Sequence, residues 1–307
     1  MLALLQKLLV AVWVFAGVVW VSWTLPASLA LAVAGLLLLT LGHAVFLAVE
    51  FIAVYIVNKR DTVPHAGVVA MVRAWVGESI MAPRVFLWRQ PFRSNAIPDW
   101  LGGEGVREAH GKRGVVFIHG FVCNRGFWNP WMAQLQKTGH PFAAVNLEPV
   151  FGSISDYIPE IEAAVVRVTQ ATGLPPLVIC HSMGGLAVRA WLRASHRAGQ
   201  PDSRVHHVIT IGSPHHGTWL SRFAFSPNGE EMRRQGQWLQ QLAQDEPEDR
   251  LKRFTCFYSN CDNIVFPAST AMLPGADNRL VTGEAHVDMA FNPSVMGQSL
   301  AMLNSAN

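Results

Sequence analysis

The chain has 307 residues, of which 50% are hydrophobic and 15% are charged, and its mean hydropathy is +0.24. This composition is too apolar for an ordinary soluble domain, so we expect a membrane part joined to a globular part. The formal net charge is only +3, and the basic residues form no dense run interleaved with aromatic side chains, which argues against a nucleic-acid partner.

Two long apolar segments open the chain. Residues 8–25 contain no charged side chain, and residues 29–57 form a second apolar run that ends just before Lys59 and Arg60. Each run is long enough to cross a bilayer as a helix. We therefore expect residues 1–60 to form a transmembrane helical hairpin surrounded by membrane lipids.

The basic residues around the two runs predict the side of the membrane on which the rest of the chain lies. Lys7 precedes the first run, and the second run is followed by Lys59, Arg60, Arg73 and Arg84. The positive-inside rule then places both ends of the hairpin, and the globular part, at the cytoplasmic face of a bacterial-type inner membrane. In the alternative, the first run is a cleaved signal peptide, and the globular part lies outside, tethered by one span.

Two ionisable residues, His43 and Glu50, lie inside the second run, seven positions apart and thus on one face of the predicted helix. Ionisable groups within a membrane are often functional. We nevertheless expect Glu50 to reach the nearby lipid headgroups and His43 to pack against the other helix, with neither taking part in the chemistry.

Residues 61–111 connect the hairpin to the globular part. Apolar residues recur at helical spacing between residues 68 and 76, with Arg73 and Glu78 on other faces. This pattern fits an amphipathic helix lying on the lipid headgroups, and equally a cap helix packed on the globular part. Residues 94–111 are rich in Gly, Pro and charge and are expected to be a linker.

From residue 112 onward, short apolar runs alternate with segments that have one apolar face. This alternation predicts an α/β domain over residues 112–307, with a mostly parallel sheet flanked by helices. Residues 218–250 carry aromatic and aliphatic side chains between charges, as expected of a lid or cap over a site. A plain pair of surface helices is the alternative.

The most informative stretch is L-V-I-C-H-S-M-G-G-L at residues 177–186. Its first four residues predict a buried parallel strand, and the apolar spacing after Leu186 predicts a helix. A strand, a tight turn and a helix form the setting in which a G-x-S-x-G elbow presents a serine, here Ser182, at the top of a sheet. Cys180 stands where the first glycine of that pattern usually is, and because cysteine is small we interpret it as a tolerated variant.

This stretch resembles the nucleophile elbow of α/β-hydrolases, and H-S-M-G-G in particular resembles bacterial lipases and esterases. S-N-C-D-N-I-V-F-P is similar to the family's S-x-x-D-x-x-V-x-P, and G-E-A-H follows where the family places its catalytic histidine. The resemblance therefore implies a triad in the chain order Ser182, Asp262, His286. His215, in a segment similar to the lipase T-P-H-x-G-[ST], is a rival for the base, but we expect it to be structural.

The resemblance also implies an oxyanion hole. Residues 115–118 predict a strand that ends in His119, Gly120 and Phe121. In the family, the residue after this His-Gly pair donates a backbone N–H to the oxyanion, which assigns Phe121 here. The second donor would be the N–H of Met183, directly after the nucleophile. We expect His119 itself to be structural.

A triad of this kind needs no metal or cofactor, and the histidines show no H-E-x-x-H or comparable spacing. The four cysteines also lack metal-site spacing, and we expect them to be free thiols. A Cys256–Cys261 bridge remains the alternative.

Apolar side chains around the expected mouth of the site favour an acyl chain as ligand: Phe121, Phe127, Trp128, Phe151, Trp219 and Phe223. Together with the resemblance, they predict a membrane-anchored serine hydrolase that cleaves carboxylic esters of acyl lipids, as a lipase, phospholipase or esterase. The alternatives are an acyltransferase or thioesterase with the same triad, and a non-catalytic hydrolase-like membrane scaffold. The sequence carries no signal for an oligomeric state.

Overall fold

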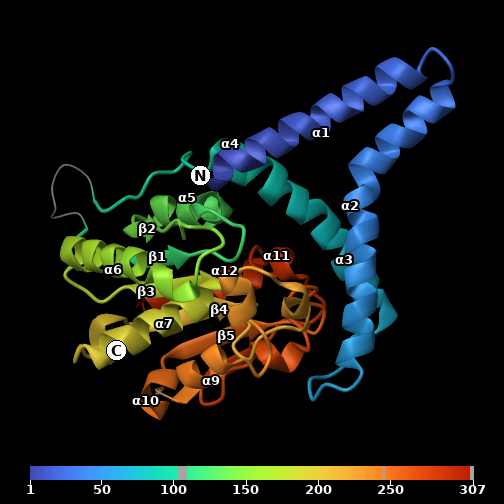
Figure 1. Cartoon of the computed structure of the whole chain (residues 1–307). Coiled ribbons are helices and arrows are strands. Elements are labelled where there is room, and N and C mark those ends of the chain that lie inside the picture. The colour runs from blue at the N-terminus through green and yellow to red at the C-terminus, as the bar shows by residue number, and fades with distance from the viewer. Residues whose placement is uncertain (103–108, 245, 305–307) are drawn as a thin grey trace.

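The computed structural model describes residues 1–102, 109–244 and 246–304. Its body is a single sheet with helices on both faces, and two long helices project from this body and meet at a tip (Figure 1). The sheet has six strands in the order β2-β1-β3-β4-β5-β6, and every neighbouring pair is parallel. The predicted mostly parallel sheet flanked by helices is therefore confirmed.

The strands form where the sequence has short apolar runs, because both faces of this sheet are covered by helices. Their bounds are Val115–Ile118 (β1), Phe142–Ala144 (β2), Leu177–His181 (β3), His207–Ile211 (β4), Phe254–Tyr258 (β5) and Asp277–Leu280 (β6). Alternate residues of a strand point to opposite faces, so Val116 joins one core cluster and Phe117 the other.

Helices of the body pack on each face. The first face is covered by α6 (Ile158–Thr172), α7 (Gly184–Arg197) and α9 (Gln237–Gln244). The second face is covered by α5 (Asn129–Thr138), α11 (His286–Met289) and α12 (Pro293–Ala301). Short helical turns occupy Arg125–Trp128 (η3), Ile154–Tyr157 (η4), Asp202–Arg204 (η5), Ala268–Ala271 (η7) and Met302–Asn304 (η8).

The N-terminal hairpin consists of α1 (Leu2–Thr24) and α2 (Leu29–Asn58). Ser28 caps α2, since its hydroxyl accepts the N–H of Leu31 at 3.3 Å. Both helices are long and apolar enough to cross a membrane, and little of their apolar surface is buried within the protein.

The segment after the hairpin continues as α3 (Val68–Pro83), the π-helix η1 (Arg84–Arg89) and α4 (Gln90–Arg93). One face of α3 is buried between α2 and α11 and carries Met71, Ala74 and Glu78. The opposite face exposes the valines at positions 68, 69, 72 and 76. The segment thus packs on the body as a cap helix would, and it also presents an apolar surface outward.

A third core cluster joins the N-terminal helices to the body. Phe51 and Val54 of α2 and Met71 of α3 pack with Phe266 and Ala285, which lie on loops after β5 and β6. The hairpin and the body therefore share a core, although the sequence suggested a division near residue 60.

The region expected to form a lid contains four short helices: η6 (Trp219–Phe223), α8 (Pro227–Glu231), α9 and α10 (Glu248–Leu251). Leu239 and Leu242 of α9 are buried in the main core, so this helix is part of the wall of the body. Phe223 and Phe225, by contrast, are 60% and 94% exposed.

Candidate active site

Ser182 lies in the turn between β3 and α7, as the elbow pattern predicts. Its φ is +54°, a left-handed conformation that is strained for a residue with a side chain. The Ser182 N–H donates to the carbonyl of Ile211 at 2.9 Å, which ties the turn to the end of β4. Only 7% of Ser182 is exposed.

Close packing requires a glycine at position 184, two residues after the serine. A Cβ on Gly184 would lie 2.5 Å from the carbonyl oxygen of Ile118 and 2.7 Å from that of His119. Since these are backbone atoms of β1 and its following turn, they cannot move aside cheaply. Cys180, at the position usually taken by the first glycine, is fully buried in the core without disturbing the elbow.

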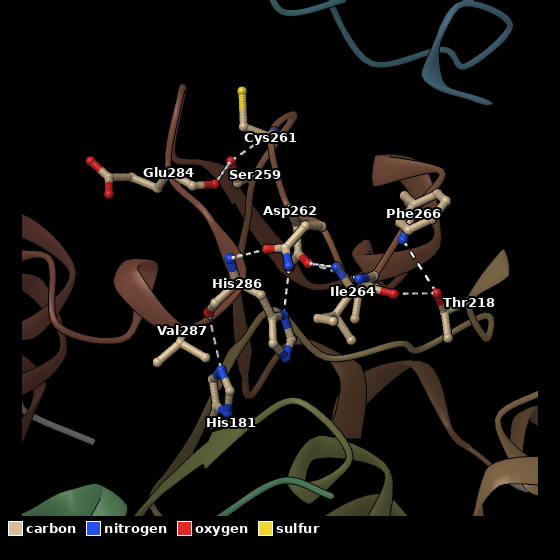
Figure 2. A network of polar contacts seen from close by, with 12 residues as sticks. His181, Thr218, Ser259, Cys261, Asp262, Ile264, Phe266, Glu284, His286 and Val287 are labelled. Atoms are coloured by element: carbon tan, nitrogen blue, oxygen red, sulfur yellow. Dashed lines mark hydrogen bonds and ion pairs between the residues drawn. The ribbon is translucent and has the colours of Figure 1, made fainter. Parts of the chain in front are cut away.

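Asp262 and His286 form a buried pair (Figure 2). The His286 Nδ1 lies 2.9 Å from the Asp262 Oδ2. The other carboxylate oxygen accepts the backbone N–H groups of Ile264 at 2.8 Å and Val265 at 2.7 Å. With all these donors directed at it, the carboxylate is fixed, and it selects the histidine tautomer that carries its proton on Nδ1. The Nε2 of His286 is then free to accept a proton.

The three residues converge at the C-terminal end of β4. Ser182 is bonded to Ile211, and the next residue is Gly212, with a φ of +57°. A Cβ on Gly212 would lie 2.9 Å from the Asp262 Oδ2 and 3.1 Å from the His286 Nδ1. Ligands of open parallel sheets bind at this carboxyl edge.

Charges around His286 favour its protonated form. Burial lowers the pKa of His286, but the Asp262 carboxylate, by its charge and its hydrogen bond, and the more distant Glu78 and Glu50 outweigh burial, so the pKa is raised above its ordinary value. A raised pKa is suited to a group that must take up a proton during a reaction.

The residues expected to form an oxyanion hole have free backbone donors. Within the described part of the chain, no acceptor receives the N–H of Phe121 or of Met183. Val122, directly after Phe121, has a φ of +53°, so this loop is strained like the elbow beside it. Strained backbone with unpaired donors is a feature of binding sites for developing negative charge.

The two other histidines considered from sequence are held by the body. His119 accepts the Leu147 N–H on Nε2 at 3.1 Å and faces the Gly120 carbonyl with Nδ1 at 2.9 Å, and burial lowers its pKa to about 4. His215 is buried against Arg189 and Thr210, and burial keeps its pKa well below the ordinary value. Both rings are therefore neutral and occupied by structural hydrogen bonds.

The expected substrate-binding residues divide into two groups. Phe127 and Trp128 are fully buried in the core, where Phe127 stacks on His181 at 4.5 Å between ring centroids and Trp128 stacks on Phe117 at 4.9 Å. The expectation that they line an open mouth was wrong, because both side chains are buried in the core cluster on one face of the sheet.

The second group faces the surface. Phe151 is 52% exposed and meets the ring of Phe121 edge to face at 5.8 Å. Trp219 stacks on Phe266, which follows Asp262 in its loop, and also contacts the exposed Phe223. These side chains flank the loops that carry the oxyanion donors and Asp262.

Sequence analysis missed the residues that brace the loops carrying Asp262 and His286. Glu50 does not reach outward as expected, because its carboxylate accepts the side-chain N–H of Asn263 at 2.8 Å. Glu78 is buried on α3 and accepts the N–H groups of Val287 and Asp288. The only signal in the sequence was the carboxylate within an apolar run.

A bound metal ion would need several histidine, cysteine or carboxylate side chains close together. Among the described residues, no group of three or more His, Cys, Asp or Glu side chains could hold a metal ion. All four cysteines are described, and each is a buried free thiol, so Cys256 and Cys261 are not bridged.

Comparison with known proteins identifies the family. Residues 115–302 match the family model described as the alpha/beta hydrolase family. The chain belongs to that family. No curated protein sequence matches it significantly.

Solved structures with this fold include two lipases. The mature lipase BlEst2 from Bacillus licheniformis is 20% identical, with a TM-score of 0.55, covering 63% of this chain and 92% of its own. Lipase B from Aspergillus fumigatus is 18% identical, with a TM-score of 0.55, covering 64% of this chain and 54% of its own. At these identities the likeness shows a shared fold.

Proposed function

We propose that the protein is a membrane-anchored serine hydrolase that cleaves carboxylic esters of acyl lipids. The observation that carries this proposal is the buried pair of Asp262 and His286 at the end of β4, next to a serine in a strained elbow. This is the arrangement of a nucleophile, a base and the group that orients the base.

In the proposed reaction, Ser182 Oγ attacks the ester carbonyl while His286 Nε2 takes the hydroxyl proton. The N–H groups of Phe121 and Met183 receive the oxyanion of the tetrahedral intermediate, and losing one such donor typically costs about 2.7–4 kcal/mol of barrier. His286 then returns the proton to the leaving alcohol, which breaks the ester C–O bond and leaves an acyl-enzyme. A water molecule activated by His286 releases the acid and restores the serine.

The preference for acyl lipids is supported by apolar surface near the site. Phe151 and Phe223 are exposed on segments next to the loops of the site, and α1 and α2 have the length and composition of membrane spans. The names of the two similar structures, both lipases, point in the same direction.

The test uses the full chain in detergent micelles or lipid nanodiscs. We expect a fluorophosphonate probe to label the wild type on Ser182, and we expect hydrolysis of p-nitrophenyl esters of graded chain length to favour longer acyl chains. Ser182→Ala should lose labelling and drop in kcat by about 10⁴–10⁶-fold. A wild-type protein that is folded but neither labelled nor active would refute the proposal.

A further inference from the structure

The main chain around His286 is held by side chains from three segments. The His286 N–H donates to Asn263 Oδ1 at 3.2 Å, and His181 Nε2 lies 3.2 Å from the His286 carbonyl oxygen (Figure 2). The next two N–H groups, of Val287 and Asp288, donate to Glu78 at 3.1 Å. These contacts fix the backbone that carries the imidazole, while Asp262 holds the ring itself.

Glu78 comes from outside the hydrolase body. It lies on α3, is 2% exposed, and bonds to residues more than 200 positions later in the chain. These residues form the first turn of α11, whose N–H groups have no partner within the helix. A carboxylate is the best acceptor for such groups, and here it anchors the start of α11, where His286 lies.

Glu50 is connected to the same histidine through the side chain of Asn263. Its carboxylate oxygen accepts the Asn263 side-chain N–H at 2.8 Å, and the oxygen of that same amide accepts the His286 N–H. Glu50 thus sets the orientation of the amide, with its oxygen toward His286. Because Asn263 directly follows Asp262, this contact also fixes the loop of the acid.

We propose that Glu78 and Glu50 are positioning residues for His286, so that α2 and α3 complete the active site and are more than an anchor. The inference rests on the proposed triad chemistry. Neither carboxylate touches the reacting atoms. Each acts by holding the imidazole in place, and displacement of a catalytic group by about 1 Å can cost about 10²-fold in rate.

The expected pattern separates positioning from general destabilisation. Glu78→Ala should lower kcat by about 10²-fold with little change in KM, because substrate contacts remain while the base is misplaced. Glu50→Leu should lower kcat by about 10-fold. Glu50→Gln should restore most of the activity, since its amide oxygen can still accept the Asn263 N–H.

The pH profile gives a readout that a purely structural role does not move. The charged and titratable groups that act on His286 are Asp262, Glu78 and Glu50, and the neutral ring of His181 lies beside it, tilted by 48° at 4.6 Å between ring centroids. Burial raises the pKa of Glu78 to about 7, against the opposing pull of His286 and its two backbone donors. Glu78→Gln removes the negative charge that Glu78 carries above this pKa, so the pKa of His286 should fall and the acid limb of kcat/KM should move to lower pH, by less than for removal of the Asp262 charge.

The experiment measures kcat, KM and the pH profile for the full chain in detergent, with Glu162→Gln as the control. Glu162 is a carboxylate that also has two side-chain partners, Trp191 and Arg204, away from both catalytic loops. Thermal unfolding followed by circular dichroism verifies folding. If Glu78→Ala does not fold, then Glu78→Gln and Glu50→Leu carry the test.

Two outcomes overturn the inference, and they are distinguishable. If the wild type hydrolyses esters and Ser182→Ala does not, but the Glu78 and Glu50 variants keep the wild-type kcat and acid limb, the positioning role is refuted and the proposed function stands. If the folded wild type neither reacts with the fluorophosphonate nor hydrolyses esters, both fail. A selective fall in kcat with a shifted acid limb, absent in Glu162→Gln, supports the inference.

Discussion

Ser182 has a φ of +54°, and a conformation of this kind costs about 1–3 kcal/mol that the surrounding structure must offset. The offset comes from its bond to Ile211 and from the close approach of α7 to β1. The benefit is that the hydroxyl stands at the end of the sheet, where His286 and Asp262 also lie. At the scale of the residue, the assignment to test is His286, and not His215, as the base for this hydroxyl.

Exchange of each histidine for alanine separates the two candidates. We expect His286→Ala to lower kcat by about 10⁴-fold or more, because it removes the base, while a folded His215→Ala keeps most of the activity. The buried His215 ring contacts Thr210 through Nε2 and Arg189 through Nδ1, so its loss should appear in thermal stability. An inactive His215→Ala beside a normal His286→Ala would show that the base is the earlier histidine.

Asp262→Asn should change the pH dependence as well as the rate. The carboxylate is the main group that raises the pKa of His286, so the neutral amide should lower that pKa. The base works only when unprotonated, and kcat/KM falls as pH drops through its pKa. The acid limb should therefore move to lower pH, while kcat falls by about 10⁴-fold because the tautomer is no longer selected. An acid limb that does not move would exclude Asp262 as the partner of the base.

Residues that lie within recognisable local motifs, such as Ser182, Asp262 and His286, could be singled out from sequence, whereas residues that reach the site from elements without a motif could not. The elbow is a strand, a turn and a helix in ten consecutive positions, so Ser182 follows from local pattern. Glu78 lies 208 positions before His286, and no periodicity relates the two. Phe127 and Trp128 show the opposite error, because nearness to a loop in sequence does not determine which way an aromatic ring points.

At the scale of the element, the junction of β3 and α7 depends on a glycine. Gly184→Ala would place a methyl group against the backbone oxygen atoms of Ile118 and His119. We expect a loss of about 1–3 kcal/mol in the free energy of unfolding, as is typical of overpacking, together with reduced activity from a displaced elbow.

A matched control for this substitution is available in α12. Gly297 is also helical, and a Cβ there would meet no atom within 4 Å. Gly297→Ala should therefore raise stability by about 0.5–1 kcal/mol and leave activity unchanged. Chemical denaturation of both variants in the same detergent gives the comparison. Equal effects at the two positions would contradict the packing argument.

The two hairpin helices differ in how much they contribute to the packing of the rest of the protein. α1 contacts the body near its N-terminus, where Gln6 donates to Gln90 at 2.8 Å. α2 contributes Phe51 and Val54 to the core cluster that covers the catalytic loops. The sequence alone divides the chain near residue 60, whereas the shared core predicts that α2 is required for activity.

Two truncations test this difference. Removal of residues 1–27 should retain a measurable part of the activity on short, soluble esters, since α2 and its contact to Asn263 remain. Removal of residues 1–60 should abolish activity, because it uncovers the apolar cluster and removes Glu50. Activity of purified, folded protein on p-nitrophenyl acetate is the measurement. Full activity without residues 1–60 would show that α2 only anchors the protein.

For the whole molecule, both ends of the hairpin are attached to the same body. Near the start of α1, the Gln6 side chain donates to Gln90 of α4 at 2.8 Å, and Asn58 at the end of α2 donates to the Asn260 carbonyl at 3.2 Å. If α1 and α2 cross a membrane, the N-terminus and the hydrolase body must lie on one side. We expect both helices to be retained, because cleavage after α1 would remove its packing against α2 and the hydrogen bond from Gln6 to Gln90.

The basic residues then predict which side this is. Lys7 lies near the start of α1, and Lys59, Arg60, Arg73 and Arg84 follow α2, whereas the turn between the helices is uncharged. By the positive-inside rule we expect the body in the cytoplasm. A C-terminal fusion to alkaline phosphatase should be inactive and a fusion to green fluorescent protein bright, because the first needs export and the second needs the cytoplasm. As a control, the same pair fused after residue 27, in the turn, should give the reverse result. High phosphatase activity of the C-terminal fusion would place the body outside, where the apolar groups around the site would meet lipids of the opposite leaflet.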